Sequence, residues 1–127
     1  MTTIIDYNGV KPRLHEDRLA VFLASRGHRV KFLPTSNEKN VRTPDFILDD
    51  NFAWEAKTLT KARSKTIQHA LSTAVKQSEN IVFDLRALGA EQSDRGEAMI
   101  VKMFGHFRRA RRLMIITRAG ELHQYNK

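Results

Sequence analysis

Residues 43–57 read TPDFILDDNFAWEAK, and this stretch decides how the rest of the chain is interpreted. It places Asp45 at the start of one β-like apolar run, and it places Glu55 and Lys57 in the next run. The polar pair Asp50-Asn51 separates the two runs, and such residues are typical of tight turns. Two short apolar runs joined in this way predict an antiparallel hairpin.

The alternation of side chains along a strand predicts which residues of this hairpin meet. In the second run Glu55 and Lys57 share one face, while Trp54 lies on the opposite face and can enter a core. Asp45 lies at the far end of the first run, so it pairs with the far end of the second. We therefore expect the carboxylates of Asp45 and Glu55 and the amine of Lys57 to form one site.

Two carboxylates and an amine suit the hydrolysis of a phosphodiester. Magnesium prefers oxygen ligands, so Asp45 and Glu55 can bind it together with water and phosphate oxygens. A bound metal ion lowers the pKa of water and neutralises charge that builds on the phosphate. Lys57 can orient or deprotonate the attacking water, or stabilise the developing oxyanion. The sequence is compatible with each of these roles for Lys57.

The net charge of the chain indicates the class of partner. The 127 residues carry a formal charge of +8, which predicts a polyanionic partner such as nucleic acid, an anionic membrane surface or an acidic protein. The alternatives are a soluble domain with surplus surface lysines, and a surface salt-bridge cluster at Asp45, Glu55 and Lys57. The order of the motif, the pleat and the charge together favour a site that acts on nucleic acid.

The length and composition predict a single domain over residues 1–127. The absence of cysteine excludes disulfides and thiolate metal sites. No apolar run approaches the roughly 18 residues of a membrane-spanning helix. Residues 1–13 lack the pattern of a signal peptide. We expect the domain to act in a cytosolic compartment.

The pattern of apolar and turn residues predicts alternating helices and strands around one sheet. On the first predicted helix, Glu16 shares a side with Leu19 and Leu23, so we expect it to point inward or toward the edge of a cleft. The predicted helices cover residues 13–26, 64–78 and 96–109. The predicted strands cover 3–7, 29–33, the hairpin 45–58, 80–85, 113–117 and 121–125, with a loop at 88–95.

Pro44-Asp45 followed by Glu55-Ala56-Lys57 resembles the signature of the PD-(D/E)xK nuclease superfamily, which includes restriction endonucleases, junction resolvases and bacterial toxins. The resemblance implies an α/β fold with a restriction-endonuclease-like core, in which helices flank a mixed central sheet. That core runs helix, three strands, helix, strand, with a helical glutamate before the Pro-Asp strand, and Glu16 occupies that place here. The resemblance implies that Asp45 and Glu55, assisted by Glu16, bind Mg²⁺ or Mn²⁺ beside Lys57.

A narrower resemblance covers residues 43–86, which are similar to the C-terminal nuclease domains of contact-dependent growth inhibition toxins. It includes Gln77-Ser78, Asn80-Ile81 and Asp84-Leu85 besides the carboxylate motif. The resemblance implies metal-dependent cleavage of RNA, with tRNA preferred over DNA, in the cytoplasm of a target bacterium. It also implies delivery from a larger secreted or surface protein and neutralisation by a cognate immunity protein, which we expect to be acidic.

Basic and polar residues outside the motif are candidates for binding nucleic acid. Lys61, Arg63 and Lys65 precede or open the second predicted helix, where phosphate binding is favoured. We also expect Gln77 to face the cleft and Arg108-Arg109 to contact a backbone phosphate. The alternatives are a solvated basic loop at 61–65 and, for the arginine pair, a favourable interaction with a helix C-terminus or an acidic inhibitor.

Two further hypotheses remain beside the toxin interpretation. The first is a DNA endonuclease of the same fold, such as a junction resolvase or a restriction-like enzyme. The second is a non-catalytic module that binds nucleic acid. The presence of Asp45, Glu55 and Lys57 together argues against the binding module.

Overall fold

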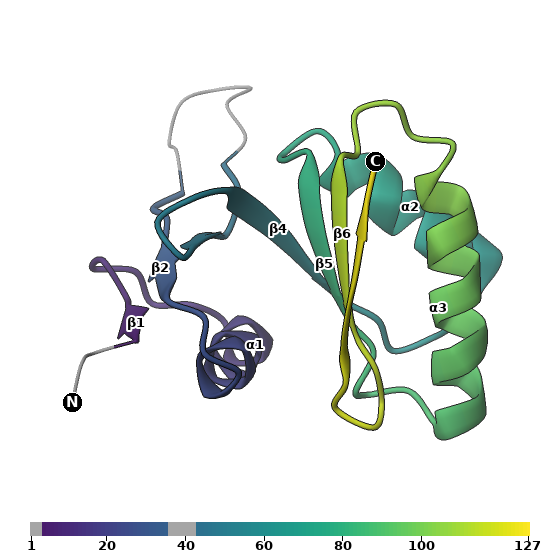
Figure 1. Ribbon diagram of the computed structural model, residues 1–127, viewed down its shortest axis with the longest axis horizontal. Coiled ribbons are helices and arrows are strands. Elements are labelled where there is room, and N and C mark those ends of the chain that lie inside the picture. The colour runs from purple at the N-terminus through teal and green to yellow at the C-terminus, as the bar shows by residue number, and fades with distance from the viewer. Residues whose placement is uncertain (1–3, 36–42) are drawn as a thin grey trace.

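A mixed seven-stranded sheet forms the centre of the fold in a computed structural model that describes residues 4–35 and 43–127 (Figure 1). The strands follow one another across the sheet in chain order. They are β1 (Ile5–Asp6), β2 (Val30–Phe32), β3 (Phe46–Leu48), β4 (Ala53–Thr58), β5 (Asn80–Asp84), β6 (Arg112–Ile116) and β7 (Leu122–Asn126). The helices are α1 (Leu14–Ser25), α2 (Ser64–Ala74) and α3 (Ala90–Phe104).

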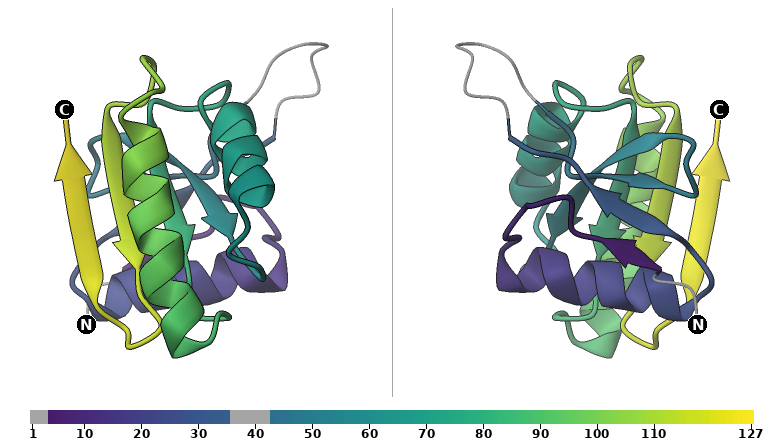
Figure 2. Two further views of the ribbon diagram at one scale, coloured as in Figure 1. Left: turned by 90° about the vertical axis from the view of Figure 1, so that its right-hand side faces the viewer. Right: turned by 90° about the vertical axis from the view of Figure 1, so that its left-hand side faces the viewer.

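The three helices cover the two faces of the sheet unequally. Figure 2 shows α2 and α3 side by side on one face, with α1 lying crosswise on the other. This arrangement follows from the connections, because β4, β5 and β6 are parallel and helices α2 and α3 link them. The predicted α/β architecture, a mixed sheet flanked by helices, is confirmed.

The β3–β4 hairpin has the turn that its sequence predicts. Asp49 and Asp50 both have positive φ angles, 55° and 58°, and the N–H of Asn51 donates to the carbonyl of Leu48 at 2.9 Å. Aspartate tolerates this left-handed backbone better than most residues. The register that results pairs Phe46 with Trp54, and this sets Asp45 beside the middle of β4.

Two apolar cores lie on opposite faces of the sheet. One joins α2 and α3 to the sheet through side chains such as Ile67, Ile100 and Phe83. The other joins α1 to the sheet through Leu19, Leu23, Trp54 and further side chains. Residues of β5 belong to both cores, and every residue of this strand is buried. That burial is typical of a strand covered on both faces.

The third helix begins and ends earlier in the chain than was predicted from the sequence. Residues 88–95 were expected to be a loop and the helix to begin at Gly96, whereas α3 begins at Ala90 and ends at Phe104. Gly96 lies inside the helix, where a Cβ would stand 3.5 Å from both Ala62 Cβ and Leu88 Cδ1. These are ordinary van der Waals distances, so Gly96 packs against the segment before α2 and does not mark the start of the helix.

The other elements match their predictions within a few residues at each end. The second helix ends at Ala74 rather than at residue 78, which leaves Gln77 in the connection to β5. Of the predicted first strand, residue 3 lies outside the described residues. No helix in the part of the chain that the structure describes is long and apolar enough to cross a bilayer.

Candidate functional site

A cleft of about 810 Å³ contains the carboxylate motif. It lies between the start of α1 and strands β2, β3 and β4. Five of the residues predicted for the site line it, namely Glu16, Asp45, Glu55, Lys57 and Gln77. The structure therefore gathers residues that are separated by up to half of the chain.

Asp45 is fixed where the chain enters β3. Its own N–H donates to the carbonyl of Trp54 at 3.0 Å, and its carbonyl accepts from the N–H of Leu33 at 3.0 Å. Its Oδ2 accepts from the N–H of Ala56 at 2.8 Å. The carboxyl group is thus held directly over the strand that carries Glu55.

Glu55 and Lys57 share one face of β4, as the pleat predicted. Glu55 is only 4% exposed, and its Oε2 lies 3.6 Å from the Nζ of Lys57. Gln77, in the connection between α2 and β5, places its amide against the same carboxyl; with the amide assigned so that its nitrogen faces Glu55, it donates to Oε1 at 2.6 Å and to Oε2. Glu55 therefore has a cation on one side and a neutral donor on the other.

The carboxyls of the half-buried Asp45 and the buried Glu55 interact strongly with each other. Burial and, to a smaller extent, the neighbouring Glu16 raise the pKa of Asp45 to about 6, against a lowering contribution from the Ala56 N–H. Burial and the negative charge of Asp45 raise the pKa of Glu55 to about 8, although Lys57 opposes the shift. Two carboxyls this close cannot both ionise without a large cost, so the pair holds a proton near neutral pH.

Glu16 stands in the first turn of α1. Its Oε1 accepts from the backbone N–H of Arg13 at 2.9 Å, so it helps to cap the helix. It also hydrogen-bonds to Asp45 and raises the pKa of that carboxyl. The predicted approach of Glu16 to the cleft is confirmed, and its contact there is with Asp45.

The donor set fits a hard divalent cation at the Asp45–Glu55 pair. Oxygen is the preferred donor for Mg²⁺, and a divalent charge would relieve the repulsion by which Asp45 raises the pKa of Glu55. Within residues 4–35 and 43–127, no group of three or more His, Cys, Asp or Glu is arranged to hold a metal ion. Two carboxylates with water and phosphate oxygens are nevertheless a common magnesium environment.

The other predicted nucleic-acid-binding residues lie outside this cleft. Lys61, Arg63 and Lys65 are exposed around the start of α2. Arg108 and Arg109 follow α3 and line a separate hollow of about 540 Å³, together with Lys76, Arg111 and Gln77. Because Gln77 lines both, this basic hollow adjoins the carboxylate cleft.

Several residues of the cleft were not singled out as site residues by the sequence. Lys11, Arg13 and His15 line it from the segment before α1 and its first turn, and Thr35 and Thr43 line it from loops. The basic pair around Pro12 was a usable signal, because it directly precedes the helix that carries Glu16. The loop threonines gave none, since their position depends on how α1 packs on the sheet.

The chain matches the model of a known protein family. Residues 42–122 match the family model "Contact-dependent growth inhibition CdiA C-terminal domain", which is more than half of the sequence. This chain belongs to the CdiA C-terminal domain family. The matched region begins before Asp45 and extends into β7, so it contains every predicted site residue except Glu16.

The fold of this CdiA C-terminal domain is similar over its whole length to that of one solved structure. The chain is similar to a chain of the CdiA-CT/CdiI toxin and immunity complex from Burkholderia pseudomallei, with a TM-score of 0.66 and 16% sequence identity. The match covers 100% of this chain and 98% of the other. At this identity the likeness shows a shared fold. A search of curated proteins finds no match.

Proposed function

We propose that this CdiA C-terminal domain is a metal-dependent nuclease toxin that cleaves RNA phosphodiesters, with tRNA as its preferred substrate. The observation that carries the proposal is the meeting of Asp45, Glu55 and Lys57 in one cleft of a chain with a formal charge of +8. Carboxyls withdrawn from solvent with strongly raised pKa values, beside a lysine in a cleft, are typical of catalytic sites.

The order of elements supports a PD-(D/E)xK-type core. The chain runs through α1 with Glu16, strands β2 to β4 with the carboxylate motif, α2 and then β5. This is the helix, three strands, helix, strand order that the motif implies. The two halves of the motif meet through the Ala56–Asp45 hydrogen bond, so their spacing in sequence becomes one site in space.

In this proposal Asp45 and Glu55 hold Mg²⁺ or Mn²⁺, with Glu16 beside them. When bound, the ion supplies Lewis acidity toward a phosphate oxygen and toward water. Ala56 and Gln77 hold the two carboxyls in place by donating hydrogen bonds to them. The role of Gln77 is to keep the Glu55 carboxyl oriented toward the cleft.

Lys57 is the group of this chain that acts on the reacting atoms. Hydrolysis forms a bond between the water oxygen and phosphorus and breaks the bond from phosphorus to the leaving oxygen. The water gives up a proton to a neutral Lys57 or to solvent, and the leaving oxygen takes a proton from solvent. The Nζ of Lys57 extends from the same face of β4 as Glu55, 3.6 Å from its carboxylate. From there it can orient the water, or donate to a phosphate oxygen whose negative charge increases.

The proposed setting is that of a toxin with an immunity protein. The family is that of contact-dependent growth inhibition, and the solved relative is a toxin and immunity complex. We infer that this domain is delivered from a larger protein into the cytoplasm of a target bacterium. The excess of positive charge favours an acidic immunity protein that covers the cleft.

A cleavage assay with matched variants tests the proposal. Purified tRNA, total RNA and plasmid DNA are incubated with the protein in magnesium or in a chelator. We expect tRNA loss in magnesium, abolished in Asp45→Asn and Lys57→Ala and retained in Arg95→Gln, which alters an exposed residue of α3. If the protein cleaves DNA alone, the proposed catalytic site stands and the proposed RNA substrate is wrong. If it cleaves none of the three substrates, the proposed nuclease activity is wrong.

A further inference from the structure

A second cleft, of about 660 Å³, lies between α1 and the segment that follows β5. We call it the α1 cleft; its lining includes His15, Arg18, Val21, Phe22, Thr58 and Arg86. His15 and Thr58 also line the carboxylate cleft, so the two clefts meet at these residues. A chain-like ligand that crosses the carboxylate cleft can therefore continue into the α1 cleft.

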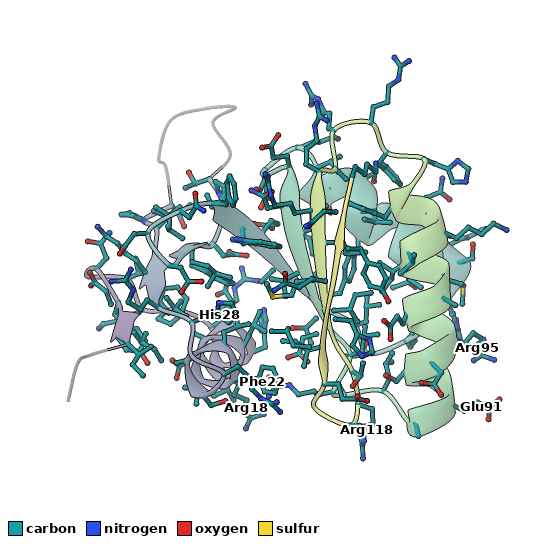
Figure 3. All side chains as sticks on the ribbon, viewed as in Figure 1. Arg18, Phe22, His28, Glu91, Arg95 and Arg118 are labelled. Atoms are coloured by element: carbon teal, nitrogen blue, oxygen red, sulfur yellow. The ribbon has the colours of Figure 1, made fainter. Side chains whose placement is uncertain are left out.

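The lining combines apolar surface with two arginines, Arg18 and Arg86, and two aspartates, Asp17 and Asp84. Val21 is 51% exposed, which is unusual for a valine on a helix that packs against a sheet. Arg18 is exposed as well, and among the described residues no hydrogen bond or ion pair involves its guanidinium. Figure 3 shows Arg18 and Phe22 on α1, far from the outer side of α3 that carries Glu91 and Arg95.

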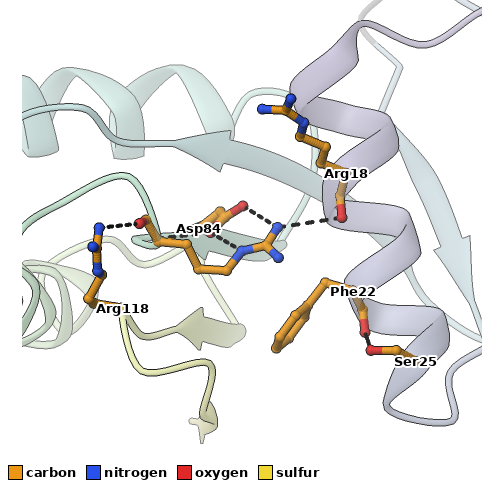
Figure 4. Close-up of polar contacts among 6 residues, drawn as sticks. Arg18, Phe22, Ser25, Asp84 and Arg118 are labelled. Atoms are coloured by element: carbon orange, nitrogen blue, oxygen red, sulfur yellow. Dashed lines mark hydrogen bonds and ion pairs between the residues drawn. The ribbon is translucent and has the colours of Figure 1, made fainter.

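Arg86 forms a fixed platform in this cleft. Its Nε and Nη2 donate to the two carboxylate oxygens of the buried Asp84 at 2.9 Å each. The same guanidinium lies over the ring of Phe22, 4.6 Å from its centroid, and its Nη2 donates to the carbonyl of Arg18 at 3.4 Å. Arg118 donates to the carbonyl of Arg86 at 3.1 Å, and Figure 4 shows this network.

The chemistry of this platform differs from that of a phosphate anchor. Asp84 neutralises the charge of Arg86, but the side chain of Arg86 remains 31% exposed. A guanidinium plane held on an aromatic ring is a surface on which nucleobases stack. Arg18, one turn before Phe22 on α1, is placed to meet the phosphate of the same nucleotide.

We propose that the α1 cleft binds the nucleotide next to the scissile phosphate, with its base against Arg86 and Val21 and its phosphate toward Arg18. This inference rests on the proposed nuclease function, because it extends the same substrate beyond the carboxylate cleft. It explains why an apolar residue and an unpaired arginine are exposed side by side on α1. It assigns a subsite for a single-stranded segment with an unstacked base.

The test measures binding, and it does not require cleavage. In an Asp45→Asn background, the dissociation constants of a uridine hexanucleotide and of the same hexamer without bases are measured at one salt concentration. We expect base removal to weaken binding about tenfold, in line with the energy of base stacking. We expect Val21→Asn to remove most of this difference, because it takes away an apolar contact without changing charge.

Arg18→Gln is compared with Arg95→Gln, which removes the same charge from the far side of the molecule (Figure 3). Leu14→Asn is the control for Val21→Asn, because Leu14 is also exposed and on α1 but outside the α1 cleft. We expect Arg18→Gln to weaken binding of both hexamers about fivefold relative to Arg95→Gln.

Equal affinities of the two hexamers, or variants that bind like their controls, would overturn the subsite. If those results accompany normal cleavage of tRNA, the nuclease function survives and only the subsite fails. If the base-dependent effects appear in a protein that cleaves nothing, the subsite stands and the nuclease function fails. No measurable binding of either hexamer would overturn the subsite as well.

Discussion

The N–H of Ala56 donates to Oδ2 of Asp45 at 2.8 Å, and this bond joins the two halves of the carboxylate motif. The residues are eleven positions apart in sequence and lie on either side of the β3–β4 hairpin. The bond holds the Asp45 carboxyl beside Glu55 even though the negative charge of Asp45 raises the pKa of Glu55. Backbone geometry therefore keeps the two carboxyls together against their mutual repulsion.

This bond predicts different consequences for two substitutions of Asp45. Asp45→Asn keeps an oxygen that can accept from Ala56 and removes the negative charge, whereas Asp45→Ala removes both. We expect Asp45→Ala to be less stable than Asp45→Asn by about 1–2 kcal/mol, since a buried backbone donor loses its partner. Urea unfolding at pH 7 measures the difference. Equal free energies of unfolding would show that the Ala56 bond contributes nothing.

The raised pKa values predict that stability falls as pH rises. Glu55 has a pKa of about 8 in the folded state against 4.5 ordinarily, and Asp45 about 6 against 3.8. Between the ordinary and folded values the folded protein binds more protons than the unfolded chain, so the free energy of unfolding decreases with pH. The stabilisation is fully present below about pH 4 and is lost by about pH 8.

The control for this pH dependence is Glu55→Gln. Other groups also titrate in this range, notably His123, whose pKa is raised by its hydrogen bond to Glu97. The comparison of wild type with Glu55→Gln isolates the carboxyl pair. We expect the variant to be more stable than wild type at pH 8 by on the order of 2 kcal/mol, and to lose less stability between pH 5 and pH 8. If the free energies of unfolding of the two proteins changed with pH in the same way, the proposed interaction between the Asp45 and Glu55 carboxyls would be contradicted.

A divalent cation is expected to stabilise the protein through the same pair. Millimolar Mg²⁺ at pH 8 should raise the melting temperature of the wild type, because ligand that binds only the folded state shifts the unfolding equilibrium. A chelator should reverse the shift. In Asp45→Asn the shift should vanish, while sodium chloride at matched ionic strength should not reproduce it in the wild type. An equal rise in melting temperature in both proteins would show that the cation binds at a site that does not include Asp45.

Two substitutions of Lys57 separate its proposed roles. Arginine keeps the positive charge and the donors but cannot act as a base, since its pKa lies far above neutrality. If Lys57 stabilises charge on the phosphate, Lys57→Arg should retain a measurable fraction of the cleavage rate and Lys57→Ala should lose about 100-fold or more. If Lys57 deprotonates the water, both variants should be equally inactive. Single-turnover cleavage rates decide between the two.

The basic hollow beside Gln77 is expected to bind the nucleic-acid backbone. Arg108 and Arg109 are exposed and line it, and the hollow adjoins the carboxylate cleft. Replacing both by Gln in the Asp45→Asn background should lower the slope of log affinity against log salt by about 0.7 to 0.9 for each lost phosphate contact. Arg95→Gln serves as the control. An unchanged slope would leave the hollow without a role in binding nucleic acid.

The sequence predicted the carboxylate site well because the controlling features are local. Alternation along β4 put Glu55 and Lys57 on one face, and the two aspartates of the turn set the register that brings Asp45 to them. Helical spacing likewise put Glu16 on the inner side of α1. These relationships need only the geometry of one strand, one turn and one helix.

The remaining features depend on tertiary packing and escaped prediction. The first half of α3 has no continuous apolar stripe, and Gly96 suggested a helix start where the structure uses it for contact with Ala62. The positions of Arg13 and Thr35 around the cleft depend on how α1 lies across the sheet. The α1 cleft was missed for the same reason, because it joins Val21 to Arg86 across a large separation in sequence.

The most direct test of the central claim is cleavage of purified tRNA in magnesium by wild type, by Glu55→Gln and by Glu91→Gln. Both variants replace a glutamate by its neutral isostere, one buried in the carboxylate cleft and the other exposed on α3 (Figure 3). The account predicts defined tRNA fragments from wild type and Glu91→Gln, and at least about 100-fold slower cleavage by the folded Glu55→Gln protein. Undiminished cleavage by Glu55→Gln would contradict it.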